Sequence, residues 1–248
     1  MNPLHLLLLF GVGTIAGTLN VIAGGGSLLT LPVLIFLGLP APMANGTNRI
    51  ALLAQNLVAV GEFRRRKVLP LKLSLLCVPS ALLGSVAGAR LAIKVDDGTF
   101  RLILGLVMLM VCVVMVIDPA RRLRLDPKRL SLARGAVLVL TFLAIGFYGG
   151  FIQAGVGFLI MTGLLVHGLD LVRVNAVKVF VVLFYTVTAL GVFVWHRQVD
   201  WSLGLALATG NALGGWLGTR LTVTRGHAWI RRFVLVTVVL FALRLIWN

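Results

Sequence analysis

Residues 20–49 read NVIAGGGSLLTLPVLIFLGLPAPMANGTNR, where three successive glycines and later Pro40 and Pro42 interrupt strongly apolar sequence. Each glycine costs a helix about 1 kcal/mol relative to alanine, so we expect the helix that begins near Leu4 to break at Gly24, Gly25 and Gly26. The apolar segment 28–37 is about half as long as a membrane span. We therefore predict that residues 4–37 form a hairpin that turns inside a membrane.

The composition places the rest of the chain in the membrane as well. Of 248 residues, 59% are hydrophobic and only 12% are charged, and the mean hydropathy is +1.04. So little polar surface could not wrap the apolar bulk of a water-soluble globule. No charged residue precedes Arg49, and residues 135–169 and 201–219 are also free of charge. These stretches predict an all-α, polytopic integral membrane protein.

The basic residues report topology rather than nucleic-acid binding. The net charge is +16, with 23 lysines and arginines. Most of them lie between apolar stretches, in clusters at residues 64–67 and 121–134, as the positive-inside rule predicts for short cytoplasmic loops. We expect a multi-pass protein of the bacterial inner membrane, in contact with lipid and with no nucleic acid as partner. The cysteines and histidines show no metal-ligand spacing, so no cofactor or metal is predicted.

The second half of the chain repeats the first. At an offset of 130, Gly38, Asn45, Gly61, Gly84, Gly88, Arg90 and Arg101 each face an identical residue. Upstream the register slips, so that Asn20 faces Gln153, and the glycines 24–26 face Gly155, Val156 and Gly157. Because each half then starts with an interrupted apolar segment, we expect two broken hairpins that meet in the protein interior, where non-helical backbone is tolerated at membrane depth. A plain helix packed closely through glycine is the alternative.

We expect each half to contain about four helical segments. Three longer helices follow each hairpin, at residues 43–61, 68–89 and 100–117, then at 172–195, 201–221 and 230–247. The boundaries are 1–118 for the first membrane repeat, 119–134 for a basic cytoplasmic connector and 135–248 for the second repeat. Charge asymmetry between the loops favours inverted repeats, and a parallel arrangement stays open. The GxxxG pairs in 84–88 and 214–218 predict close packing inside the protein, and a homodimer interface is the alternative.

Two cations within apolar helices, Arg49 and Lys178, are the first candidates for a site, because an ionisable group at bilayer depth is costly. They occupy adjacent repeat positions, close to Asn45 and Asn175. If helices start near these residues, the free N–H groups and the positive helix end would favour an anion. The alternative places both cations at the membrane edge, reaching toward headgroups. Separately, we expect Asn20 and Gln153 beside the breaks, and also Thr47, either to bind solute oxygens or to satisfy freed backbone groups.

The ordered motifs AGGG, LPVLIFLGLP, ANGTN, GGFIQAGVGF and VNAVK resemble the sulfite exporter TauE/SafE family, also called TSUP. The resemblance covers almost the whole chain. It implies a polytopic transporter of sulfite, sulfoacetate and related sulfur or carboxylate anions. It also implies a site built from the glycine breaks together with Asn45, Thr47, Asn48, Asn175 and Lys178, whereas Arg49 is suggested by its charge alone.

These residues bear on three classes of function. A secondary transporter or exporter of a small anion, most simply sulfite or an organosulfonate, would use alternating access between the two halves. An intramembrane enzyme would need a nucleophile, a base or a metal set in the apolar core, and no such constellation is found. A non-transporting assembly or scaffold subunit remains as the alternative, although it gives the repeated breaks and buried cations little purpose. The sequence therefore favours transport and predicts no enzyme.

Overall fold

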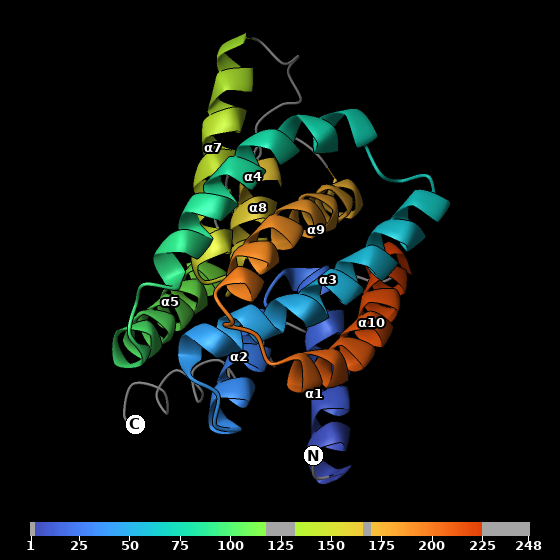
Figure 1. The fold of residues 1–248 in the computed structure, drawn as a ribbon. Helices are drawn as coiled ribbons and strands as arrows, with labels where there is room; N and C mark the ends of the chain where they lie inside the picture. Colours follow the sequence, from blue (N-terminus) through green and yellow to red (C-terminus); the bar gives the residue numbers. More distant parts are fainter. Residues whose placement is uncertain (1–2, 118–131, 166–169, 225–248) are drawn as a thin grey trace.

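The computed structural model describes residues 3–117, 132–165 and 170–224, and every regular element in these ranges is an α-helix (Figure 1). The helices of the first half are α1 (Pro3–Ala23), α2 (Ser27–Phe36), α3 (Ala41–Arg65), α4 (Leu71–Ala92) and α5 (Asp97–Ile117). Those of the second half are α7 (Leu132–Phe151), α8 (Val156–Leu165), α9 (Leu171–Trp195) and α10 (Trp201–Thr224). The predicted all-α class is confirmed for the described residues.

Both predicted breaks are present. The backbone passes through the left-handed region at Gly24, with φ of +86°, and at Gly155, with φ of +69°, a conformation that glycine adopts without steric cost. A β-carbon added at Gly26 would collide with the carbonyl oxygen of Ala16, so the start of α2 lies back against α1. The chain therefore folds into the expected hairpin.

Glycine and proline also set the next boundary. Gly38, with φ of +97°, follows the end of α2, and Pro40 and Pro42 introduce α3, where the missing N–H costs no helical bond. The other described helices begin and end within about four residues of the predicted bounds. The predicted helix at 230–247 lies outside the described residues. So does the connector at 119–134, except for its last residues, which begin α7.

The side chains are arranged as in a protein surrounded by lipid. Large apolar side chains face outward, including Leu4 at 68% exposure and Leu83 at 71%, whereas Arg49 is fully buried. Among the described helices, α1, α4 and α9 are long and apolar enough, by length and composition, to cross a membrane. Many exposed leucines together with a fully buried arginine reverse the pattern of a soluble domain and suit a multi-pass membrane protein.

Helices of one half pack against helices of the other half: α1 lies along α10, and α4 lies along α7. Gly84 and Gly88 in α4 are in such close contact with α7 that an added β-carbon would strike the backbone carbonyls of Leu143 and Phe147. In the same way, Gly214 and Gly218 in α10 lie against α1. The GxxxG pairs therefore pack inside the protein, as predicted.

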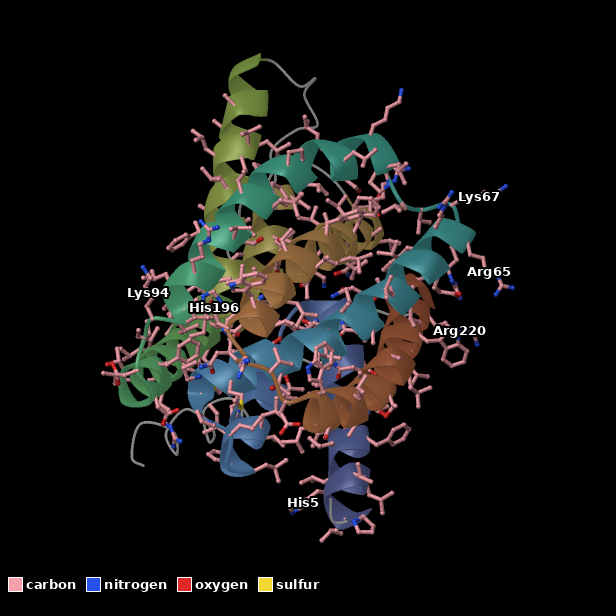
Figure 2. The ribbon with its side chains drawn as sticks, in the orientation of Figure 1. His5, Arg65, Lys67, Lys94, His196 and Arg220 are labelled. Atoms are coloured by element: carbon pink, nitrogen blue, oxygen red, sulfur yellow. The ribbon has the colours of Figure 1, made fainter. Side chains whose placement is uncertain are left out.

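Equivalent parts of the halves lie at different sides of the molecule. In Figure 1, α1 begins at the bottom of the view and α7 begins at the top. Figure 2 places Lys94, just after α4, on one side together with His196. It places Arg220, near the C-terminal end of α10, on the other side together with Arg65 and Lys67. The matching ends of α4 and α10 thus do not lie side by side.

The packing of α4 on α7 predicts a difference between two glycines. Gly84→Ala should lower the apparent stability of the purified protein by about 1–3 kcal/mol, because its methyl group meets backbone that cannot move aside. Gly61→Ala is the matched control, since no atom lies within 4 Å of its added β-carbon. Thermal melting in detergent compares the two. Equal melting temperatures would contradict the close approach of α4 and α7.

Candidate functional site

The two breaks touch each other in the interior. A β-carbon added at Gly24 would lie 2.5 Å from the Cα atom of Gly157, so only glycine fits on either side of this contact. Gly25 faces the ring of Phe158, and Gly155 faces the side chain of Val111. The prediction that the breaks meet inside the protein is confirmed. Four helix ends therefore converge here, the C-terminal ends of α1 and α7 and the N-terminal ends of α2 and α8.

The end of α1 is capped by two residues from α9. The Nζ atom of Lys178 donates to the carbonyl oxygens of Asn20, at 2.9 Å, and Val21, at 2.7 Å. Asn175 donates to the carbonyl of Ile22 at 3.4 Å and accepts from Lys178 at 2.6 Å. A helix leaves its last four carbonyls without intrahelical partners, and these two side chains supply donors to three of the last carbonyls of α1.

The end of α7 is capped in the same way by two residues from α3. Arg49 donates to the carbonyl oxygens of Gly149, at 3.1 Å, and Gly150, at 2.5 Å. Asn45 donates to the carbonyl of Phe151 at 2.8 Å. The guanidinium also lies over the ring of Phe193, 4.8 Å from its centre. Each half therefore supplies one cation and one asparagine that cap the broken helix of the other half.

The position of the cations corrects the sequence interpretation. The anion hypothesis depended on helix starts near Arg49 and Lys178, but each of these residues lies about two turns inside its helix. Their side chains reach the C-terminal, negative ends of α1 and α7, where a positive charge is stabilised. The membrane-edge alternative is wrong as well, because Arg49 is 0% and Lys178 only 3% exposed.

A further pair of amides joins each break to its own half. Asn20 donates from Nδ2 to Oε1 of Gln55 at 3.2 Å, and Gln153 donates from Nε2 to the hydroxyl of Tyr185 at 3.0 Å. Sequence reasoning missed Gln55 and Tyr185. The sequence signal that could have identified them is the offset of 130, which pairs these two polar residues inside apolar helices. Gln153 adopts the left-handed conformation, with φ of +59°. Its Oε1 atom accepts from Nη1 of Arg49 at 3.5 Å.

One predicted site residue, Thr47, lies away from this junction of breaks. Thr47 accepts the backbone N–H of Asp200 at 2.9 Å and so fixes the start of α10. Asn48 accepts from Thr30 at 2.7 Å and donates to Ser27 at 3.2 Å, which holds the first turn of α2 against α3 at the junction. The structure brings together Asn20, Gly24, Gly25, Gly26, Asn45, Asn48, Arg49, Gln153, Gly155, Gly157, Asn175 and Lys178.

The junction is positively charged. Arg49 and Lys178 are the buried cations among the described residues, and those residues include no buried aspartate or glutamate. Their partners are carbonyls, amides and an aromatic ring. The Nε atom of Arg49 and the Oδ1 atom of Asn45 are buried without a hydrogen-bond partner. The site thus holds two basic side chains without a buried carboxylate among the described residues, together with unused polar atoms.

The comparisons with known proteins agree on membrane transport. The family model described as sulfite exporter TauE/SafE matches residues 9–245. A probable membrane transporter protein of Haemophilus influenzae is 28% identical over 244 residues, which cover 98% of this chain and 95% of the relative. The corresponding protein ORF9 of a Sinorhizobium species is 30% identical, with 98% and 93% covered. YfcA of Escherichia coli K12, also a probable membrane transporter protein, is 27% identical, with 100% and 92% covered.

No solved structure gives a significant match to the chain. The family description and the names of the relatives describe transporters rather than enzymes, which confirms the predicted class.

The capping role of Lys178 predicts a loss of stability when the amine is removed. Lys178→Met leaves the carbonyl of Val21 without its donor and leaves that of Asn20 with the N–H of Gly24 alone, and an unsatisfied buried group costs about 1–3 kcal/mol. Lys72→Met is the matched control, because Lys72 is exposed near the start of α4. Thermal melting in detergent should show a clear drop for the first variant and none for the second. A Lys178→Met protein as stable as the control would rule out the cap.

Proposed function

The chain belongs to the sulfite exporter TauE/SafE family of membrane transporters, and we propose that it carries a small oxyanion across the bacterial inner membrane by alternating access. Sulfite or an organosulfonate such as sulfoacetate is the favoured solute. The family description supports the sulfur chemistry. The negative charge of the solute is supported by the junction of the breaks.

One observation carries the proposal. Two cations are buried where two broken helices meet, and the described residues place no buried carboxylate there. Desolvating one charge costs several kcal/mol even after the surroundings relax. Carbonyl partners offset part of that cost for Arg49 and Lys178 but leave their net charge in place. An anion that enters the junction supplies the missing countercharge.

The short helices direct their positive ends toward the junction. The N-terminal ends of α2 and α8 lie directly after the breaks, and the dipole at a helix start attracts anions. The N–H groups of Leu28 and Leu29 already donate to the carbonyls of Gly25 and Gly26, so in the proposed complex the anion accepts from the unpartnered Nε atom of Arg49. Half-helices that point at an anionic substrate are a recurring feature of transporters built from repeats.

The arrangement proposed for the halves is an inverted repeat. The opposite starting points of α1 and α7 (Figure 1) and the separation of Lys94 from Arg220 (Figure 2) support it. Arg65 and Lys67 lie on the side of Arg220, and the positive-inside rule assigns that side to the cytoplasm. Rocking one half against the other around the junction would then expose the site to each side in turn.

Transport itself is tested with the purified protein in proteoliposomes. Radiolabelled sulfite, sulfoacetate, thiosulfate and acetate are loaded inside, and efflux is measured with and without an inside-negative potential. We expect sulfite efflux above that of empty liposomes. It should rise with the potential, because 100 mV favours exit of one negative charge by about 2.3 kcal/mol.

Arg49→Gln should abolish this flux, because it removes a buried positive charge, whereas Lys72→Gln should not change it. Size-exclusion profiles of both variants check that they are folded. If no anion of the panel moves faster than in empty liposomes, the chain has a non-transporting role such as assembly, and the proposal is wrong.

The inverted arrangement predicts which loops share a side. In a chain whose two cysteines, Cys77 and Cys112, are replaced by alanine, single cysteines are introduced by Arg65→Cys, Val223→Cys and Lys94→Cys. A membrane-impermeant thiol reagent applied to intact cells should label only Lys94→Cys, and the other two should react after the membrane is opened. Labelling of Val223→Cys together with Lys94→Cys would favour parallel repeats instead.

A further inference from the structure

A basic groove opens between α4 and α9, apart from the junction of breaks. It has a volume of about 670 Å³, and its lining includes Arg90, Lys94, His196, Trp195 and Thr188. Figure 2 shows Lys94 and His196 near each other on the side opposite Arg65 and Arg220. The volume falls in the range of small-molecule sites, about 300–1,000 Å³.

The charge of this basic groove is not neutralised. Within the described residues, neither Arg90 nor Lys94 forms an ion pair, and no acidic residue lines the groove. The acids that follow in the loop are engaged elsewhere. The carboxylate of Asp96 accepts the backbone N–H of Thr99 at 2.9 Å, and the carboxylate of Asp97 pairs with Arg101 at 2.8 Å. The groove therefore presents two positive charges to solvent.

The inner end of the groove lies close to the junction of breaks. Thr188 lines the groove, and its hydroxyl lies 2.8 Å from the hydroxyl of Ser85. Ser85 in turn lies against Gly150, whose carbonyl oxygen accepts from Arg49. Three contacts, two hydrogen bonds and one close approach of backbone, therefore link the groove to the guanidinium.

The corresponding positions on the other side of the molecule differ. At an offset of 130, Trp216 replaces Val86 and Arg220 replaces Arg90. The guanidinium carbon of Arg220 lies 3.8 Å from the centre of the Trp216 ring. Glu62 and Arg66 replace Val192 and His196 and form an ion pair at 2.8 Å. There the cations face an indole ring and a carboxylate, so the unpaired charge of the basic groove belongs to one side.

We propose that the basic groove is the outer vestibule through which the transported oxyanion passes between the external solution and the junction of breaks. This inference rests on the proposed function and adds the residues that hold the oxyanion on the outer side. Arg90 and Lys94 act by raising the local anion concentration, because a cleft lined by one sign of charge focuses the field. They are not expected to change the translocation step.

Transport kinetics test the vestibule in vesicles of zwitterionic lipid, with radiolabelled sulfite supplied at fixed salt on the side of Lys94. The double variant Arg90→Gln/Lys94→Gln should raise KM for sulfite about five- to tenfold and leave kcat within a factor of two, since charged clefts raise encounter rates by about 10–10³. Lys72→Gln, at the other end of α4, is the matched control and should keep the native KM. An unchanged KM in the double variant would overturn the vestibule while leaving transport intact.

A lipid phosphate could satisfy the same two cations, and a second lipid composition distinguishes this source. If the groove held a headgroup, the double variant would lose activity only in vesicles that contain anionic lipid, and its KM in zwitterionic vesicles would be native. That result would overturn the proposal. A raised KM in both compositions supports it.

A third measurement is independent of transport. Trp195 lines the groove and is 84% exposed. The difference in fluorescence between the native protein and Trp195→Phe is therefore the emission of this one tryptophan in the groove. In detergent, iodide should quench this component more strongly than neutral acrylamide does, and Arg90→Gln/Lys94→Gln should remove the excess. Equal iodide quenching before and after the charge change would refute anion recruitment, even if no anion in the flux panel is transported.

Discussion

Carbonyl groups at the end of a helix that stops inside a bilayer need hydrogen-bond donors, and lipid offers none. The rest of this structure depends on how the ends of α1 and α7 meet that need. Lys178 and Asn175 reach the first break from α9, and Arg49 and Asn45 reach the second from α3. Such reach requires that the hairpin of one half lie against the helices of the other, and the glycine contacts of α4 with α7 and of α10 with α1 bring them that close.

The same capping of α1 and α7 determines the electrostatics of the site. Each cation lies at the negative end of a helix, which carries about half an elementary charge. The cap therefore stabilises Arg49 and Lys178 without cancelling them, and the N-terminal ends of α2 and α8 add positive potential at the same junction. One arrangement thus closes the backbone hydrogen bonds and leaves a centre suited to a negative solute.

The sequence predicts the breaks, the repeat and most helix bounds, because glycine clusters and polar residues in apolar segments act locally or by a fixed offset. It does not predict what the buried cations contact. Whether Lys178 serves the start of its own helix or the end of α1 depends on which helices are neighbours, and the local run VNAVK is the same in both cases. Gln55 and Tyr185 were missed although the offset of 130 pairs them, because each resembles an ordinary polar residue when its half is considered alone.

Because each half caps the broken helix of the other, the order of synthesis determines when each cap can form. A ribosome makes the chain from its N-terminus, so the break after α1 enters the membrane while its donor, 158 residues away from Asn20, has not yet been made. The break after α7 is inserted when Arg49 is already in the bilayer. The first hairpin is therefore capped only after the second half has been synthesised, whereas the second hairpin can be capped as soon as it is inserted. Two halves that are related in space are thus unequal during biosynthesis, and the molecule is complete only after α9 has joined the first half.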